Sequence, residues 1–312
     1  MITKKSKIFI AGHNGMVGSA INRTLSSQGY ENIYTIPKKK LDLLNQKKVI
    51  EYFKKNRFDC VYIAAAKVGG ISANDIDKPR FLYENLQIQN NLINTSYETG
   101  VKNLIFLGSS CIYPKKAKNP IKENQILTGP LESTNEAYAI AKISGVKMCE
   151  YYKNKYNLNY KSLMPSNIYG VGDNYDSDNS HFFPALIKKI HFAKIHKLDS
   201  VVIWGTGKPR RELIYVDDVA KACTHFMNLK CKESLLNVGS GKDYPIKFYV
   251  KFIMKKLNFF PKIIYDTSKP DGTYKKLIDN SLSKKYKWQP SVSLDKGFEI
   301  TYEDFIKRNK SQ

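Results

Sequence analysis

The sequence predicts an α/β protein: a doubly wound parallel sheet joined to a smaller, discontinuous α/β domain. Short apolar runs alternate with helical segments, a glycine-rich loop follows the first apolar run, and that loop opens a helix. Strands and helices alternating at this spacing form parallel strands joined by right-handed crossovers. We expect residues 1–165 and about 210–235 to form a Rossmann-type domain, and about 166–209 and 236–312 to form the second domain.

The composition is that of an ordinary globular chain with an excess of positive charge. It has 312 residues, 42% of them hydrophobic, and 51 Lys and Arg against 28 Asp and Glu give a formal net charge of +23. Only six residues are arginine and the lysines are spread over every segment, so we expect no nucleic-acid interface but a surface suited to polyanionic ligands. No apolar run reaches the ~18 residues of a membrane span. The basic N-terminus leads straight into the first strand, so we expect a cytoplasmic protein with no membrane contact.

The five cysteines are odd in number and show no C-x-x-C spacing. We therefore expect neither a disulfide scaffold nor a metal site. Cys111 differs from the others because it lies in a loop after a predicted strand, where a thiol can act as a base.

The first loop, GHNGMVG, carries glycines at 12, 15 and 18 between a strand at Lys7–Ala11 and a helix from about Met16. The first glycine permits a tight turn, the second lets the backbone approach a diphosphate, and the third lets helix pack on strand. The spacing predicts a dinucleotide whose diphosphate sits on the helix N-terminus.

The second predicted strand, Asn32–Ile36, is followed by Pro37 and three lysines rather than by an acidic residue. An acidic side chain at this point would bind the ribose 2′-hydroxyl of NAD, so the lysines favour the 2′-phosphate of NADP. The alternative is a solvated basic turn. Asp42 is a candidate for the adenine end, and the small residues of the third strand, Cys60–Ala66, let a cofactor lie across its end.

The stretch from Leu107 to Lys142 carries the strongest chemical signal. Tyr138 and Lys142 are four residues apart and share one face of a predicted helix. A phenol titrates near pH ~10, and a neighbouring ammonium group favours the phenolate, so we expect Lys142 to lower the pKa of Tyr138. Ser109, after the fourth strand, could hydrogen-bond the carbonyl that Tyr138 protonates. Tyr-x-x-x-Lys alone is a weak signal, but together with the serine and the glycine loop it predicts an active site.

Longer stretches narrow this prediction. They are GHNGMVG from Gly12, AAAKVGG from Ala64, SSCIYPK from Ser109, YAIAK from Tyr138, MPSNIYG from Met164 and NSHFFPAL from Asn179. Together they resemble the GDP-L-fucose synthases, members of the extended short-chain dehydrogenase/reductases, from about residue 7 to about residue 290.

The resemblance implies three sets of site residues. Catalysis would use Ser109, Cys111, Tyr138, Lys142 and His181, the last as an acid rather than a simple helix cap. NADP would contact Gly12, Asn14, Gly15, Met16, Val17, Gly18, Lys38, Asp42, Leu43, Ala65, Leu107, Gly108, Ser109, Tyr138, Lys142, Pro165, Asn167, Ile168 and His181. The nucleotide sugar would contact Ser110, Cys111, Asn167, Lys189, Trp204, Arg211, Lys269 and Asp271. Asn14 and Lys189 stand where the family has arginine, which weakens the 2′-phosphate contact at the first and a bidentate contact at the second.

The implied reaction is the NADPH-dependent 3,5-epimerisation and 4-reduction of GDP-4-keto-6-deoxy-D-mannose to GDP-L-fucose. Cys111 would remove the protons at C3 and C5, His181 would return them on the opposite face, and Tyr138 would protonate O4. Three alternatives stay open: a C4-reductase for an already epimerised GDP-4-keto-6-deoxy-hexose or heptose, an NAD-dependent 4-epimerase, and a non-enzymatic NADP sensor. The family also implies a homodimer, formed through helices near 80–97 and 138–151.

Overall fold

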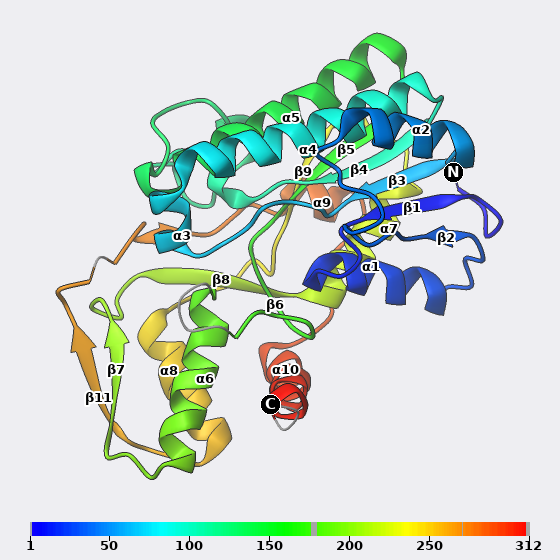
Figure 1. Ribbon diagram of the computed structural model, residues 1–312. Helices are drawn as coiled ribbons and strands as arrows, with labels where there is room; N and C mark the ends of the chain where they lie inside the picture. The colour runs from blue at the N-terminus through cyan, green and yellow to red at the C-terminus, as the bar shows by residue number, and fades with distance from the viewer. Residues whose placement is uncertain (1, 176–179, 270, 310–312) are drawn as a thin grey trace.

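The computed structural model describes residues 2–175, 180–269 and 271–309, and its larger part is built on a six-stranded parallel sheet (Figure 1). The strands are β1 (Ile8–Ala11), β2 (Ile33–Tyr34), β3 (Cys60–Ile63), β4 (Asn103–Leu107), β5 (Asn159–Pro165) and β9 (Leu235–Val238). Their order is β2-β1-β3-β4-β5-β9, and every neighbouring pair is parallel. The order reverses at β1, so the crevice expected to hold a dinucleotide opens at the carboxyl ends of β1 and β3. The predicted fold class is confirmed.

Helices cover both faces of this sheet, and alternate side chains of β1 show why. Ile8 and Ile10 belong to one apolar core together with residues of α1 (Met16–Ser27) and α7 (Val216–Met227). Phe9 and Ala11 belong to a second core on the other face. The helices of that second face are α2 (Gln46–Asn56), α4 (Lys78–Glu98) and α5 (Glu136–Tyr156), with the short α3 (Ile71–Ile76) before α4. Strands buried on both faces require runs of apolar residues, which is the pattern seen in the sequence.

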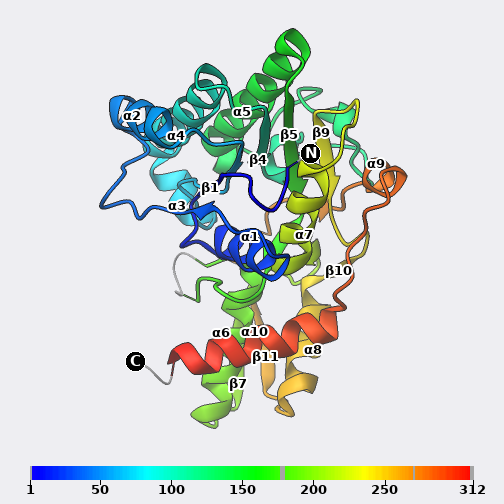
Figure 2. The same cartoon turned by 90° about the vertical axis from the view of Figure 1, so that its right-hand side faces the viewer.

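The smaller part is organised around β8 (Arg210–Tyr215). It pairs in parallel with β6 (Asn167–Tyr169) and β12 (Lys275–Lys276) and antiparallel with β10 (Asp243–Pro245), while β7 (Ser200–Trp204) and β11 (Lys262–Asp266) form a separate parallel pair. Its helices are α6 (Phe182–Ile195), α8 (Ile246–Leu257) and α10 (Leu294–Asn309), and Figure 2 shows α10 crossing beside the other two. The remaining elements are α9 (Ser281–Lys285) and the 3₁₀ turns η1 (Ser110–Ile112), η2 (Glu123–Gln125) and η3 (Ser133–Asn135).

Two strands change the predicted domain boundaries. β9 pairs with β5, Leu236 opposite Leu163, so it completes the large sheet although we assigned residues from 236 onward to the second domain. β8 was predicted in the Rossmann domain, but its partners all lie in the smaller part. Strand pairing between segments far apart in the chain decides both assignments, and local sequence does not report it.

Among the described residues, every helix is too short or too polar to cross a bilayer.

Candidate active site

The glycine loop has the geometry that a bound diphosphate needs. Gly12 has a φ of +87°, and a Cβ at this position would lie 2.6 Å from the backbone nitrogen of Ala65. A Cβ on Gly18 would overlap the carbonyl oxygen of Gly12. Gly15 is the N-cap of α1 and makes no side-chain capping hydrogen bond, so the first backbone N–H groups of the helix are available to an anion. The residues present therefore fit a dinucleotide cofactor.

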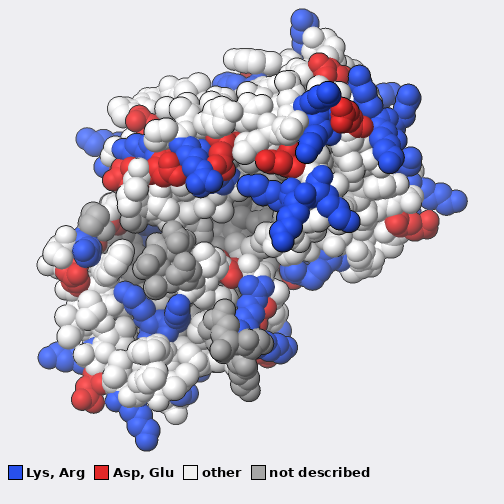
Figure 3. Space-filling model, in the orientation of Figure 1, with Lys and Arg blue, Asp and Glu red and all other residues white. Residues whose placement is uncertain are grey.

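The loop after β2 presents a basic edge beside this site. Lys38, Lys39 and Lys40 are all exposed, and Figure 3 shows Lys and Arg side chains along the rim of the hollow between the two parts of the molecule. Asp42 caps the next turn, because its Oδ1 accepts a hydrogen bond of 3.1 Å from the backbone nitrogen of Leu44. Exposed ammonium groups are suited to a 2′-phosphate.

Lys142 lies between the end of β4 and Tyr138. Its Nζ donates a hydrogen bond of 2.8 Å to the carbonyl oxygen of Leu107 and lies 5.7 Å from the centroid of the Tyr138 ring. It also lies 4.6 Å from the ring centroid of Phe106. The helix and the strand end thus bring together the pair that the sequence singled out.

The expected lowering of the Tyr138 pKa does not hold in this structure. Burial raises the pKa of Tyr138, and the charge of Cys111 raises it further. Burial also lowers the pKa of Lys142 to about 8, because the ammonium group loses solvent. The prediction considered only the attraction between the two groups, whereas desolvation is the larger effect here. A neutral phenol is the form that can donate a proton.

Cys111 and Ser109 lie on the turn that follows β4. The backbone nitrogen of Cys111 donates a hydrogen bond of 3.4 Å to Oγ of Ser109, and Cys111 is only 5% exposed. Burial raises the pKa of the thiol, while Lys276, Ser109 and Lys142 act in the opposite direction. The thiol, the phenol and the lysine therefore share one site.

Lys276 was not among the predicted residues. It lies in β12, far along the chain from Cys111, and no local motif marks it in a sequence so rich in lysine. Only the pairing of β12 with β8 brings it to the site.

His181 lies at the start of α6 with an exposed side chain. Its side chain makes no capping hydrogen bond within the described part of α6, which argues against the simple cap. Although the residue keeps exposed surface, the protein atoms packed around its imidazole displace water and lower its pKa, so the imidazole is more readily neutral. The motif residue Asn179 lies outside the described residues.

The segment after β5 joins the two sheets. Asn167 Nδ2 donates a hydrogen bond of 2.9 Å to the carbonyl oxygen of Glu212 in β8, and the backbone nitrogen of Ser166 donates one of 3.1 Å to Val238 in β9. Pro165, Asn167 and Ile168 are therefore held at the boundary where a cofactor and a substrate would meet.

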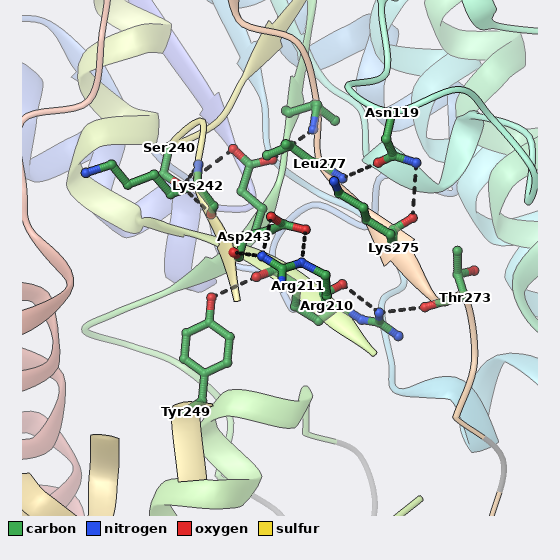
Figure 4. A network of polar contacts seen from close by, with 12 residues as sticks. Asn119, Arg210, Arg211, Ser240, Lys242, Asp243, Tyr249, Thr273, Lys275 and Leu277 are labelled. Atoms are coloured by element: carbon green, nitrogen blue, oxygen red, sulfur yellow. Dashed lines mark hydrogen bonds and ion pairs between the residues drawn. The ribbon is translucent and has the colours of Figure 1, made fainter. Parts of the chain in front are cut away.

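Arg211 is the central cation of the smaller sheet (Figure 4). Its guanidinium donates hydrogen bonds of 2.6 Å to the carbonyl oxygen of Thr273 and 2.9 Å to that of Arg210. Burial lowers its pKa, and Asp271 and Glu132 oppose this effect. These hydrogen bonds occupy some of the N–H donors of the guanidinium group and fix the orientation of the others.

Trp204 presents an exposed ring beside two ammonium groups. The residue is 58% exposed, and Lys189 Nζ and Lys269 Nζ lie 5.3 Å and 5.7 Å from its ring centroid. An open indole face beside two cations suits a flat base attached to a diphosphate.

Asp271, predicted to contact the nucleotide sugar, also makes contacts within the protein. Its two carboxylate oxygens accept hydrogen bonds of 2.7 Å each from the backbone nitrogen and Oγ1 of Thr206. The carboxylate therefore holds the loop between β7 and β8 in place, next to Trp204, and its contact with a sugar hydroxyl stays a prediction.

Among the described residues, no group of three or more His, Cys, Asp or Glu side chains is placed to hold a metal ion.

A family model, curated relatives and solved structures all match most of this chain. Residues 8–239 match the NAD dependent epimerase/dehydratase family. The chain is 47% identical to the putative GDP-L-fucose synthase 2 of Arabidopsis thaliana, over 98% of this chain and 93% of that protein. It is 43% identical to the GDP-L-fucose synthase of Escherichia coli K12, over 97% of each. Among solved structures, the GDP-mannoheptose C4 reductase MlghC from Campylobacter jejuni with NADP bound matches with a TM-score of 0.90 and 35% identity, covering 98% of this chain and 100% of that one.

Proposed function

Because this chain belongs to the NAD dependent epimerase/dehydratase family, we propose that it catalyses the NADPH-dependent 3,5-epimerisation and 4-reduction of GDP-4-keto-6-deoxy-D-mannose to GDP-L-fucose. The observation that carries this proposal is that Lys142, held by the Leu107 carbonyl at the end of β4, lies 5.7 Å from the ring of Tyr138, while Cys111 lies on the turn that follows the same strand. A thiol suited to carbon deprotonation and a phenol suited to ketone protonation therefore serve the same substrate carbon skeleton.

The epimerisation uses the acidity that the C4 ketone confers on C3 and C5. The Cys111 thiolate takes a proton from C3 or C5, and the electron pair of the broken C–H bond moves toward O4 to form an enolate. Ser109 and Tyr138 donate hydrogen bonds to O4. His181 then gives a proton to the opposite face of the same carbon, which inverts the centre.

The reduction uses the same oxyanion contacts. Bound at the glycine loop of Gly12, Gly15 and Gly18, NADPH would supply the hydride for C4. Tyr138 gives its phenolic proton to O4, and its raised pKa keeps that proton in place until O4 becomes basic. Lys142, held by the Leu107 carbonyl, stabilises the phenolate that remains.

The diphosphate of the substrate belongs at the smaller sheet. Arg211 and the two lysines beside Trp204 supply positive charge, and the open indole ring supplies a surface on which the guanine can stack.

A C4-reductase without epimerisation is the second candidate, and the similarity to MlghC favours it. Incubating the purified protein with GDP-4-keto-6-deoxy-D-mannose and NADPH in D₂O separates the two. GDP-L-fucose with deuterium at C3 and C5 supports the first proposal. Loss of NADPH with an unlabelled GDP-6-deoxyhexose as product shows a reductase without epimerase activity. If no NADPH is lost, a GDP-heptose ketone is the next substrate to test.

We also propose a cytoplasmic homodimer that pairs through α4 and α5. These helices expose Tyr83 and Tyr151, each more than 60% accessible, and Ile140 at 43%. A second copy would cover this apolar surface. All five cysteines are unpaired, as is usual in a reducing compartment.

A further inference from the structure

One face of α10 follows the segment of chain that leaves β6. Four residues of this face are spaced three or four apart along the helix, so they form a single stripe. They are Gly297, Thr301, Asp304 and Arg308. In Figure 1 the chain after β6 runs between α1 and α10. Each position of the stripe contacts part of residues 169–175, which directly follow the predicted cofactor residues Asn167 and Ile168.

The first half of the stripe packs on the two tyrosines of this segment. A Cβ on Gly297 would overlap the hydroxyl group of Tyr169, so only glycine allows this approach. One turn later, the carbonyl oxygen of Thr301 accepts a hydrogen bond of 3.2 Å from the hydroxyl group of Tyr175. The ring centroid of Tyr175 also lies 4.8 Å from that of Phe305. Both ends of the segment are therefore fixed on α10.

Asp304 makes the central contact. Its Oδ2 accepts a hydrogen bond of 3.0 Å from the backbone nitrogen of Gly172, and its side chain is only 16% exposed. Arg308 Nε donates a hydrogen bond of 3.2 Å to Asp304, and Arg308 Nη1 donates one of 3.3 Å to the carbonyl oxygen of Asp173. An ion pair with an exposed arginine contributes little, whereas a backbone N–H bound to a carboxylate is a strong hydrogen bond. Asp304 is therefore the main anchor of the loop at residues 170–175.

This loop lies against the end of α1 that is predicted to bind the cofactor. A Cβ on Gly172 would lie 3.4 Å from Cα of Met16 and 3.7 Å from Oγ of Ser19. The loop backbone at Gly172 is therefore directly beside the first turn of α1. Met16 follows the N-cap Gly15, and the backbone N–H groups of this turn are those available to a diphosphate.

We infer that residues 170–175 form one side of the dinucleotide site, and that Asp304 is a positioning residue that holds them against α1. The inference rests on the proposed NADP(H) cofactor but not on the identity of the sugar. A loop that is already fixed loses little conformational freedom when the cofactor binds, so the affinity is not reduced by the cost of ordering it. Asp304 acts through the loop and does not itself touch the cofactor.

The test compares Asp304→Ala with Asp304→Asn, whose amide oxygen can still accept the hydrogen bond from Gly172. Glu303→Ala is the matched control, because Glu303 is the exposed neighbour on the same helix and its loss also removes one negative charge.

A second, milder pair of variants covers the case in which Asp304→Ala does not fold. Tyr175→Phe removes the hydrogen bond to Thr301 but keeps the aromatic ring. Tyr302→Phe is its control, because the hydroxyl group of Tyr302 is hydrogen-bonded at 2.8 Å to Nδ1 of His191 in α6 and not to the loop.

Three quantities are measured without any sugar ketone. They are the Kd of NADPH from its fluorescence, the Kd of GDP from calorimetry, and the hydrogen–deuterium exchange of residues 170–175 in the ligand-free protein. We expect Asp304→Ala to weaken NADPH binding about tenfold and Tyr175→Phe to weaken it about threefold, both with faster exchange in the loop. Asp304→Asn should recover most of the affinity. The two controls should bind NADPH as the wild type does, and GDP binding should stay unchanged throughout.

Unchanged NADPH affinity in Asp304→Ala, despite faster exchange at residues 170–175, would overturn the inference, because the loop would then lie outside the cofactor site. An equal loss of GDP affinity would also overturn it, since α10 would then support the fold as a whole. Failure of the proposed function gives a different result. A wild type that binds NADPH but does not convert GDP-4-keto-6-deoxy-D-mannose would refute that function, and the variants would still decide the role of Asp304.

Discussion

Lys142 donates a hydrogen bond of 2.8 Å to the carbonyl oxygen of Leu107, which ends β4. Leu107 is 7% exposed, so the ammonium group is held at a nearly dry strand end, one helical turn from Tyr138. β4 also leads into the turn with Ser109 and Cys111. The hydrogen bond from Lys142 to Leu107 therefore links the helix that carries Tyr138 to the turn that carries Cys111.

Replacing Lys142 should separate the two activities. We expect Lys142→Met to lower C4 reduction by at least ~100-fold, since proton transfer from Tyr138 loses the cation that stabilises its phenolate. Deuterium exchange at C3 and C5 should fall much less. NADPH oxidation and NMR of the product measure both. Lys147→Met, which removes an ion pair with Glu150 on the same helix, is the control. Equal loss of both activities would show that Lys142 mainly supports the fold.

Tyr138→Phe should end reduction and leave proton exchange in place. The phenol supplies the proton for O4, whereas Cys111 and His181 handle the carbon-bound protons. The measurement is NADPH loss beside deuterium content at C3 and C5. Tyr151→Phe, on an exposed part of the same helix, is the matched control. Reduction at the wild-type rate by Tyr138→Phe would remove this residue from the mechanism.

Trp204→Ala should weaken binding of the GDP-sugar but not of NADPH. Stacking on an aromatic ring contributes ~1–3 kcal/mol per base, so we expect the KM for the substrate to rise about tenfold or more. The residue is 58% exposed, so the melting temperature and the affinity for NADPH should stay as in the wild type. Trp204→Phe should recover part of the loss. An unchanged KM would place the base elsewhere.

Glu212 should make stability depend on pH. Burial raises its pKa from 4.5 to about 7, against the hydrogen bonds from Ile278 and Gly241. Between these values the native state binds more protons than the unfolded chain, so the free energy of unfolding falls as pH rises from about 4.5 to about 7.

Urea unfolding measured from about pH 4.5 to about pH 7 tests this pH dependence of stability. Glu212→Gln should have a shallower dependence than the wild type, while Asp199→Asn, at an exposed site, controls for loss of one negative charge. Some slope should remain, because burial raises the pKa of Asp173 to about 7 as well. Parallel profiles for Glu212→Gln and wild type would contradict the assignment.

The parts of the fold predicted correctly depend on local chemistry. Gly12, Gly15 and Gly18 lie where the loop spacing predicts, since a turn with positive φ and a close helix approach exclude a Cβ. The helix predicted to carry Tyr138 and Lys142 is present as α5. β9 and β8 were assigned to the wrong parts, because an apolar run of a few residues does not state which distant strand it will pair with.

The residues of the candidate site also divide into those predictable from local sequence and those placed only by tertiary structure. The sequence indicates Ser109, Cys111, Tyr138 and Lys142 as site residues. They lie within one stretch of the chain, and their side-chain types indicate the chemistry they can perform. The sequence misses Lys276 and does not indicate the contact between Asp271 and Thr206, because both are placed by the register of the smaller sheet and its loops.

The sequence by itself determined the cofactor loop, the reactive residue types and the class of fold, because these follow from backbone sterics and side-chain chemistry over short distances. Only the tertiary structure decided the ionisation of those residues. Burial raises the pKa of Tyr138 and Cys111 and lowers that of Lys142. Desolvation depends on everything packed around a group, including a lysine in a strand at the far end of the chain.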